Sequence, residues 1–196
     1  MASSHATIGV VLAGGASTRM GAPKAGLPLG DGTLIERPLA ALAAAGLEAV
    51  VVAKADSPLP PLEVPRWDEP DSPRHPLCGI VAALERAGAP IVVLACDMPH
   101  VPPALVERLA RTPADAALPV VGGMSQPLVA RYAPAALEPL AAALAAERAL
   151  RAAVAALGPA TIDEVELRRY GDPARMFANV NRPEDLDALG RLERPG

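Results

Sequence analysis

The sequence predicts an α/β fold: a three-layer α/β/α sandwich whose Rossmann-like, mostly parallel sheet carries a small β-hairpin insertion. Short apolar segments rich in valine and isoleucine alternate with amphipathic segments, as in chains built from strand–helix–strand units. The apolar segments are hydrophobic throughout, which is typical of strands buried on both faces of a parallel sheet. We expect a single domain over residues 1–196, because this length suits one core and no linker-like stretch divides it.

Composition excludes several classes of function. The net charge is −4 and no long basic run occurs, which argues against a nucleic-acid-binding surface. No apolar stretch approaches the roughly 18 residues that a membrane span needs. Residues 1–6 lack the basic and apolar regions of a signal peptide, so we expect a cytoplasmic protein. In that compartment Cys78 and Cys96, which lack metal-ligand spacing, are expected to be reduced and packed.

The first predicted unit is strand, helix, strand. Thr7–Leu12 is an apolar, β-branched run that predicts a buried strand. Thr33 and Glu36 have the spacing of a capping box, so a helix is expected from there to about Ala45. Pro38 lies one turn into this helix and is expected to remove a backbone hydrogen bond and bend its start.

The remaining elements follow in the same alternating order. Gly122 and Gly123 separate two short apolar runs and predict the turn of the β-hairpin. Pro139 is expected to break a long alanine-rich helix into two pieces. In chain order we expect strands at residues 49–53, 64–67 and 91–96, helices at 79–87 and 102–111, hairpin strands at 116–121 and 126–131, helix at 134–157, a strand at 161–167 and a last helix at 183–192.

A glycine-containing loop follows the first strand and predicts a phosphate-binding site. Gly14 and Gly15 can take positive φ and let a ligand approach the backbone closely. Arg19 and Lys24 add positive charge, and Lys24 is one of only two lysines in the chain. The spacing matches neither the P-loop nor the G-x-G-x-x-G dinucleotide fingerprint. The alternative is that Lys24 is simply a solvated loop residue.

The same loop resembles a family signature. Residues 12–15, 19–21 and 24 read L-A-G-G, R-M-G and K, as in L-A-G-G-x-x-x-R-M-G-x-x-K of nucleotidyltransferases similar to molybdenum cofactor guanylyltransferase, the MobA family. The resemblance implies a fold of the nucleotide-diphospho-sugar transferase type. Cytidylyl- and sugar-nucleotide transferases share the pattern. Pro23 replaces a frequent Asp, and the loop is one residue shorter.

Asp97 is the second candidate. It leaves the apolar strand at residues 91–96, and open α/β sheets bind ligands at the carboxyl ends of their strands. A single carboxylate facing a triphosphate suits Mg²⁺, which takes its other ligands from phosphate and water. The alternative is that Asp97 caps the turn or the next helix. Cys96-Asp97-Met98-Pro99 resembles the family's metal-holding C-D-x-P element.

Two further matches suggest nucleotide or pterin contacts. Asp68 precedes Pro76-Leu77-Cys78-Gly79, which is similar to the family's G-P-L-A-G element, and the resemblance implies that Asp68 contacts nucleotide. Asp71 competes for this role, and a solvated loop carboxylate is the alternative for both. Asn179 and Asn181 lie in a segment similar to the family's F-x-N-x-N-T-P-E-D-L, although Asn181 could serve only as a helix N-cap.

The resemblance implies transfer of GMP from GTP to the phosphate of molybdenum-bound molybdopterin, with release of pyrophosphate. Arg19, Lys24 and Asp97 would be catalytic, with Mg²⁺ on Asp97. Backbone at Leu12, Ala13 and Gly14 would hold the guanine, and Gly15, Lys24, Asp68, Asp97, Asn179 and Asn181 complete the expected binding residues. We expect a monomer, with molybdenum-insertion proteins as candidate partners.

Three other functions remain open from the sequence. A cytidylyltransferase for the same cofactor usually has L-A-A-G, and Gly14 at the second alanine position favours guanine. Sugar-nucleotide pyrophosphorylases are generally longer and carry a separate sugar-binding region. A non-catalytic nucleotide-binding protein has no need to retain Arg19, Lys24 and Asp97 together.

Overall fold

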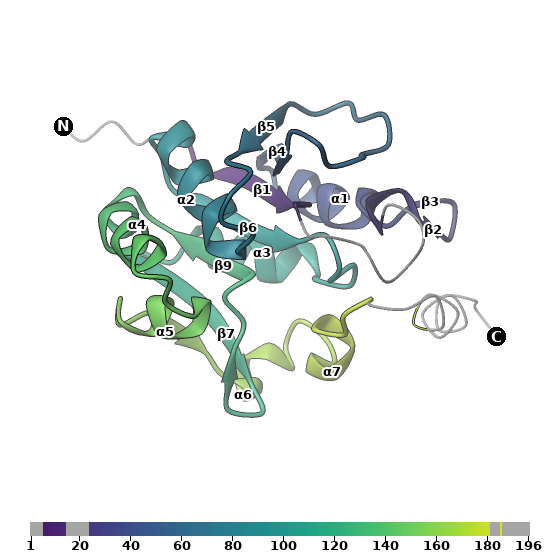
Figure 1. Ribbon diagram of the computed structural model, residues 1–196. Coiled ribbons are helices and arrows are strands. Elements are labelled where there is room, and N and C mark those ends of the chain that lie inside the picture. The colour runs from purple at the N-terminus through teal and green to yellow at the C-terminus, as the bar shows by residue number, and fades with distance from the viewer. Residues whose placement is uncertain (1–5, 15–23, 181–184, 186–196) are drawn as a thin grey trace.

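The computed structural model of the protein describes residues 6–14, 24–180 and 185 (Figure 1). A central sheet has the strand order β10-β7-β9-β6-β1-β4-β5, with β8 paired to β7, and β2 and β3 form a separate two-stranded sheet. The strands are β1 (Ile8–Leu12), β2 (Pro28–Leu29), β3 (Gly32–Thr33), β4 (Glu48–Lys54), β5 (Arg66–Glu69), β6 (Ile91–Ala95), β7 (Ala116–Val121), β8 (Met124–Ser125), β9 (Val129–Tyr132) and β10 (Ala160–Ile162).

Helices cover both faces of the central sheet. They are α1 (Glu36–Ala44), α2 (Pro76–Ala87), α3 (Pro103–Ala110), α4 (Leu137–Ala145), α5 (Leu150–Ala155), α6 (Glu164–Leu167) and α7 (Pro173–Met176), with 3-10 turns η1 (Lys24–Gly26) and η2 (Pro134–Ala136). Val11 of β1 lies in one core cluster with side chains of α1 and α3. Val10 lies in the other cluster with side chains of α2, α4 and α5. Successive residues of one strand thus face opposite helix layers, which confirms the predicted sandwich.

The sheet is mostly parallel with one inserted antiparallel strand. β1 pairs in parallel with both β4 and β6, and β4 pairs in parallel with β5. β9 is antiparallel to its two neighbours, β6 and β7. The predicted hairpin turn forms between β7 and β8, where Gly122 and Gly123 have φ values of 56° and 72°. A two-residue hairpin turn of this kind requires positive φ at both residues, which glycine adopts without strain.

The first helix begins later than the sequence predicts. α1 starts at Glu36 with Ile35 at its N-cap, and Thr33 makes no side-chain cap. One half of the predicted capping box is present, because the Glu36 carboxylate accepts a hydrogen bond from the Thr33 backbone N–H. With this start Pro38 is the third helical residue, whose N–H would have no intrahelical partner. The expected loss of a hydrogen bond at Pro38 is therefore wrong.

Two elements in the second half also differ from expectation. Pro139 lies in the first turn of α4, where proline is tolerated, and the helix ends instead at Ala145. Glu147, with φ 52°, lies between α4 and α5 and marks the break. The strand predicted over 161–167 ends at Ile162, because the Asp163 carboxylate accepts from the Glu166 N–H and starts α6.

Among residues 6–14, 24–180 and 185, no helix is both long enough and apolar enough to cross a membrane. Cys78 and Cys96 are both buried free thiols, as expected. The predicted last helix at 183–192 falls almost wholly outside the described residues.

Candidate functional site

The carboxyl ends of four parallel strands meet at one edge of the sheet. Leu12, the last residue of β1, is in register with Val52 of β4 and Ala95 of β6. Lys54 and Glu69, which end β4 and β5, are also in register with each other. The loops that follow these strands must leave from the same edge, and this edge is where open α/β sheets bind ligands.

Lys24 and Asp97 form an ion pair at this edge. Lys24 lies in η1, after the loop that leaves β1, and Asp97 follows β6. Lys24 Nζ donates to Asp97 Oδ2 at 3.0 Å, and the two side chains are 18% and 30% exposed. The structure therefore brings together two of the three predicted catalytic residues, which lie far apart in the chain. Arg19, the third, lies outside the described residues, as does Gly15.

The backbone that the resemblance assigns to the guanine is fixed from both sides. The Ala13 N–H donates to the Val52 carbonyl at 2.9 Å, and the Cys96 N–H donates to the Leu12 carbonyl at 3.1 Å. Gly14 follows these residues and is half-buried. Its φ is not positive, so the expected use of left-handed backbone does not hold at Gly14.

The C-terminal segment reaches the same place. The Val180 N–H donates to the Asp97 carbonyl at 2.9 Å, which anchors the end of this segment beside β6. Asn179, the residue before Val180, is exposed to solvent. Asn181, the other predicted asparagine, lies outside the described residues.

Asp68 and Asp71 lie at the end of β5 and just beyond it. Asp68 is 63% exposed and accepts a hydrogen bond from Arg66 Nε at 3.0 Å. Its neighbour Glu69 points to the opposite face of the sheet, since side chains alternate along a strand. Asp71 is an exposed residue of the following loop. Both aspartates are therefore accessible from solvent at this edge of the sheet.

The P-L-C-G element is the first turn of α2, and not a loop before it. α2 begins at Pro76, earlier than predicted, while β5 lies two residues later than predicted. His75 caps the helix, because its Nδ1 accepts from the Leu77 N–H at 3.1 Å. This N-cap was not predicted from the sequence, in which His75 stands as an isolated loop histidine. The positive end of α2 therefore lies at the carboxyl edge of the sheet.

Sequence reasoning missed a buried ion pair at this edge. Lys54 Nζ lies 3.5 Å from Glu69 Oε1, and the side chains are only 2% and 6% exposed. Lys54 Nζ also donates to the Pro70 carbonyl at 2.5 Å. Burial raises the pKa of Glu69, and the nearby Lys54 ammonium opposes this rise. Lys54 is one of only two lysines in the chain, and this rarity could have marked it as a candidate in the same way as Lys24.

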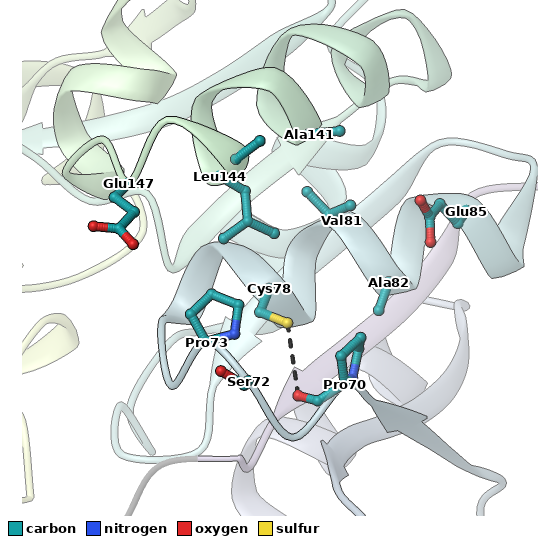
Figure 2. Close-up of a pocket in the computed structure, with 11 residues that line it drawn as sticks. Pro70, Ser72, Pro73, Cys78, Val81, Ala82, Glu85, Ala141, Leu144 and Glu147 are labelled. Atoms are coloured by element: carbon teal, nitrogen blue, oxygen red, sulfur yellow. Dashed lines mark hydrogen bonds between the residues drawn. The ribbon is translucent and has the colours of Figure 1, made fainter.

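Both thiols are poor nucleophiles in this environment. Burial raises the pKa of Cys96 to about 12, and the adjacent Asp97 carboxylate adds to the rise. Burial also raises the pKa of Cys78. Cys78 Sγ contacts the Pro70 carbonyl at 3.8 Å and lines a groove of about 490 Å³ between α2 and α4 (Figure 2). None of the predicted site residues lines this groove.

Comparison with known proteins agrees with the fold and shows the family of the chain. Residues 9–162 match the family described as MobA-like NTP transferase domain. A "Probable molybdenum cofactor guanylyltransferase" from Chloroflexus aggregans is 36% identical over 194 residues, which is 91% of this chain and 90% of that protein. The molybdenum cofactor guanylyltransferase of Burkholderia vietnamiensis is 36% identical over 203 residues, covering 93% of this chain and 95% of the other.

A solved structure also supports membership of this family. The molybdopterin-guanine dinucleotide biosynthesis protein A from Archaeoglobus fulgidus superposes with a TM-score of 0.80 at 27% identity, covering 95% of this chain and 98% of the other. The family match includes the end of β1, Lys24 and Asp97, so the ion pair at the sheet edge lies inside the matched region. The chain belongs to the MobA-like NTP transferase family.

Proposed function

We propose that the protein transfers GMP from GTP to the phosphate of molybdenum-bound molybdopterin, which gives the guanine dinucleotide form of the cofactor and pyrophosphate. One observation carries the proposal: Lys24 and Asp97 lie 3.0 Å apart at the carboxyl edge of the sheet. An ammonium and a carboxylate at one point of the sheet edge suit a triphosphate and its cation. The names of the relatives in Chloroflexus and Burkholderia support guanine and this acceptor.

The reaction needs no protein nucleophile. An oxygen of the pterin phosphate forms a bond to the α-phosphorus of GTP, and the bond from that phosphorus to the bridging oxygen breaks. The electron pair leaves with pyrophosphate. Catalysis then consists of positioning the two substrates and stabilising charge on phosphate oxygens. Lys24 would supply positive charge to the triphosphate, and we assign the same role to Arg19.

Asp97 has the character required for Mg²⁺ that enters with the nucleotide. It offers one partly exposed carboxylate, and no group of three or more acidic, histidine or cysteine residues that could hold a metal occurs among the described residues. Mg²⁺ commonly uses one or two protein carboxylates and completes its shell with phosphate and water. When bound there, the ion would polarise phosphate oxygens as a Lewis acid.

Nucleotide binding is the first test. Calorimetry with GTP, CTP and ATP, each with and without Mg²⁺, should show a preference for GTP that depends on Mg²⁺. A molybdopterin-dependent release of pyrophosphate from GTP should follow. Preference for CTP would replace the guanylyl by a cytidylyl reaction, and binding of none of the three would refute the proposal. A monomeric state and contacts with molybdenum-insertion proteins stay predictions.

A further inference from the structure

The buried pair of Lys54 and Glu69 has no part in the proposed phosphate chemistry. Both residues end strands at the carboxyl edge of the sheet, where the nucleotide is proposed to bind, and both side chains are almost fully buried. Lys54 holds the start of the next loop as well, through the Pro70 carbonyl. A buried ion pair adds little net stability compared with well-packed apolar side chains. Its position at the nucleotide edge points to a role beyond stability.

The Glu69 carboxylate fills space that two glycines leave open. A Cβ placed on Gly14 would overlap Glu69 Oε1 and lie 3.1 Å from the carboxylate carbon. A Cβ placed on Gly79 would lie 2.8 Å from Glu69 Oε2 and 2.9 Å from Cδ2 of Leu12. The carboxylate is therefore enclosed between the end of β1 and the first turns of α2.

The backbone at residue 14 has little freedom to move away. Ala13 is bonded to β4, and Leu12 is bonded to the residue that follows β6. The Glu69 side chain is likewise held by Lys54 on its other side. Since the φ of Gly14 is not positive, an alanine would suffer no backbone strain there. A side chain at residue 14 would therefore compete with the Glu69 carboxylate for the same volume.

We infer that Glu69, held by Lys54, is a positioning residue for nucleotide binding, and that residues 14 and 69 are coupled. This inference rests on the proposed function, in which the backbone of Leu12–Gly14 holds the base. The Glu69 carboxylate packs against the backbone of residue 14 and thereby sets the position of that backbone. A change from L-A-G-G to L-A-A-G, the sequence associated with cytidylyl transfer, would have to displace the Glu69 carboxylate.

A double-mutant cycle tests the coupling. Gly14→Ala is made in the wild-type chain and in Lys54→Met/Glu69→Ala, which removes both charges together and leaves room for a methyl group. We expect Gly14→Ala to weaken GTP binding about tenfold or more in the wild-type chain, and clearly less in the second background. In Glu69→Gln the effect of Gly14→Ala should stay large, because the amide keeps the shape of the carboxylate. Equal losses in all three backgrounds would overturn the coupling.

A control and a second ligand separate positioning from general damage. Gly26→Ala is the matched control, because a Cβ there meets only a Pro60 carbon at 4.0 Å. Lys54→Met/Glu69→Ala should bind GTP more weakly but bind tripolyphosphate, which lacks a base, as the wild type does. Equal weakening of both ligands would overturn the positioning role.

Failure of the proposed function gives a different result from failure of this inference. If the wild-type chain binds no nucleotide, the proposed function fails and the positioning role fails with it. The urea midpoints of the same variants still report whether residues 14 and 69 are coupled. A Gly14→Ala midpoint shift that persists unchanged in Lys54→Met/Glu69→Ala would contradict the packing argument independently of GTP.

Discussion

At Asp97 one residue makes two kinds of contact. Its carboxylate binds Lys24, and its backbone carbonyl accepts from the Val180 N–H. The first contact joins η1 to the residues that follow β6. The second holds the C-terminal segment at the same point, so three of the four segments that carry the family's motifs meet at Asp97.

Asp97→Asn should reduce GMP transfer without unfolding the protein. The amide keeps the size of the side chain but removes the charge that Mg²⁺ and Lys24 need, so we expect kcat/KM to fall about a hundredfold or more. A partly exposed ion pair contributes at most about 1 kcal/mol to stability. Pyrophosphate release and urea unfolding measure the two effects. Asp56→Asn, which affects an exposed carboxylate paired with Arg74, is the control. Full activity of Asp97→Asn would remove this residue from the mechanism.

The Cys96 thiol should react slowly in the folded protein. A rise in pKa from the ordinary 9.0 to about 12 lowers the thiolate fraction about a thousandfold at neutral pH. In the Cys78→Ala variant, reaction with a disulfide reagent at pH 8 should therefore be much slower in buffer than in denaturant. Similar rates in the two solutions would show that Cys96 is accessible and ionised.

At the scale of single elements, α2 is the helix that orients the site. His75 caps its start beside β5, and Gly88 ends it in the left-handed conformation with φ 56°. Nothing lies within 4 Å of a Cβ placed on Gly88, so backbone conformation alone determines the need for glycine there.

Gly88→Ala should destabilise the protein by about 1 kcal/mol, because alanine is strained at positive φ. The urea midpoint should decrease with an unchanged slope. Gly26→Ala, at a position without positive φ, should lower the midpoint by less. If the two alanine variants had the same midpoint, the strain argument would be wrong. Because Gly88 lies at the opposite end of α2 from Gly79, we also expect GTP binding to change little in Gly88→Ala.

The elements that were predicted well are those that one physical signal determines. β1 and β6 are apolar throughout, and β4 is apolar between Glu48 and Lys54. Asp97 follows the most apolar of these strands, so the strand and the site at its carboxyl end could be predicted together. The segment at 161–167 alternates in hydrophobicity, which suits either a strand or an amphipathic helix over so few residues. The N-cap of Asp163 decided in favour of a helix. Pro139 was misplaced because its effect depends on where the helix begins.

The burial of Glu69 could not be predicted from the sequence, because it depends on contacts with residues that are distant in the chain. It follows an exposed aspartate and precedes a proline-rich loop, so local sequence favours a solvated side chain. Its partner Lys54 comes from another strand, and the glycines that make room for it come from β1's loop and from α2. The approach of these four residues depends on sheet register, which no short window of sequence contains.

For the whole molecule, the same carboxylate makes stability depend on pH. The raised pKa of Glu69 means that the folded protein holds this proton more tightly than the unfolded chain does. The free energy of unfolding should therefore decrease as pH rises from the ordinary value of 4.5 through the raised pKa. Lys54, which opposes the rise, and the buried Cys78 thiol are its titratable neighbours.

Comparison with Glu69→Gln isolates this contribution. Urea unfolding of both proteins between about pH 4.5 and 7 should show the wild type losing stability relative to Glu69→Gln as pH increases. The amide has no proton to lose in this range, so the other carboxylates cancel in the difference. A difference that grows in favour of the wild type would mean that Lys54 outweighs burial.

The position of β9 has a consequence for synthesis on the ribosome. β6 contributes the most apolar strand, and it needs β1 on one edge and β9 on the other. β1 is translated before β6, but β9 begins only at Val129, after α3 and β7. Until that residue emerges, one edge of β6 presents unpaired amides and carbonyls that another nascent chain could bind. The strand that positions Asp97 thus keeps one open edge during translation until β9 has been made.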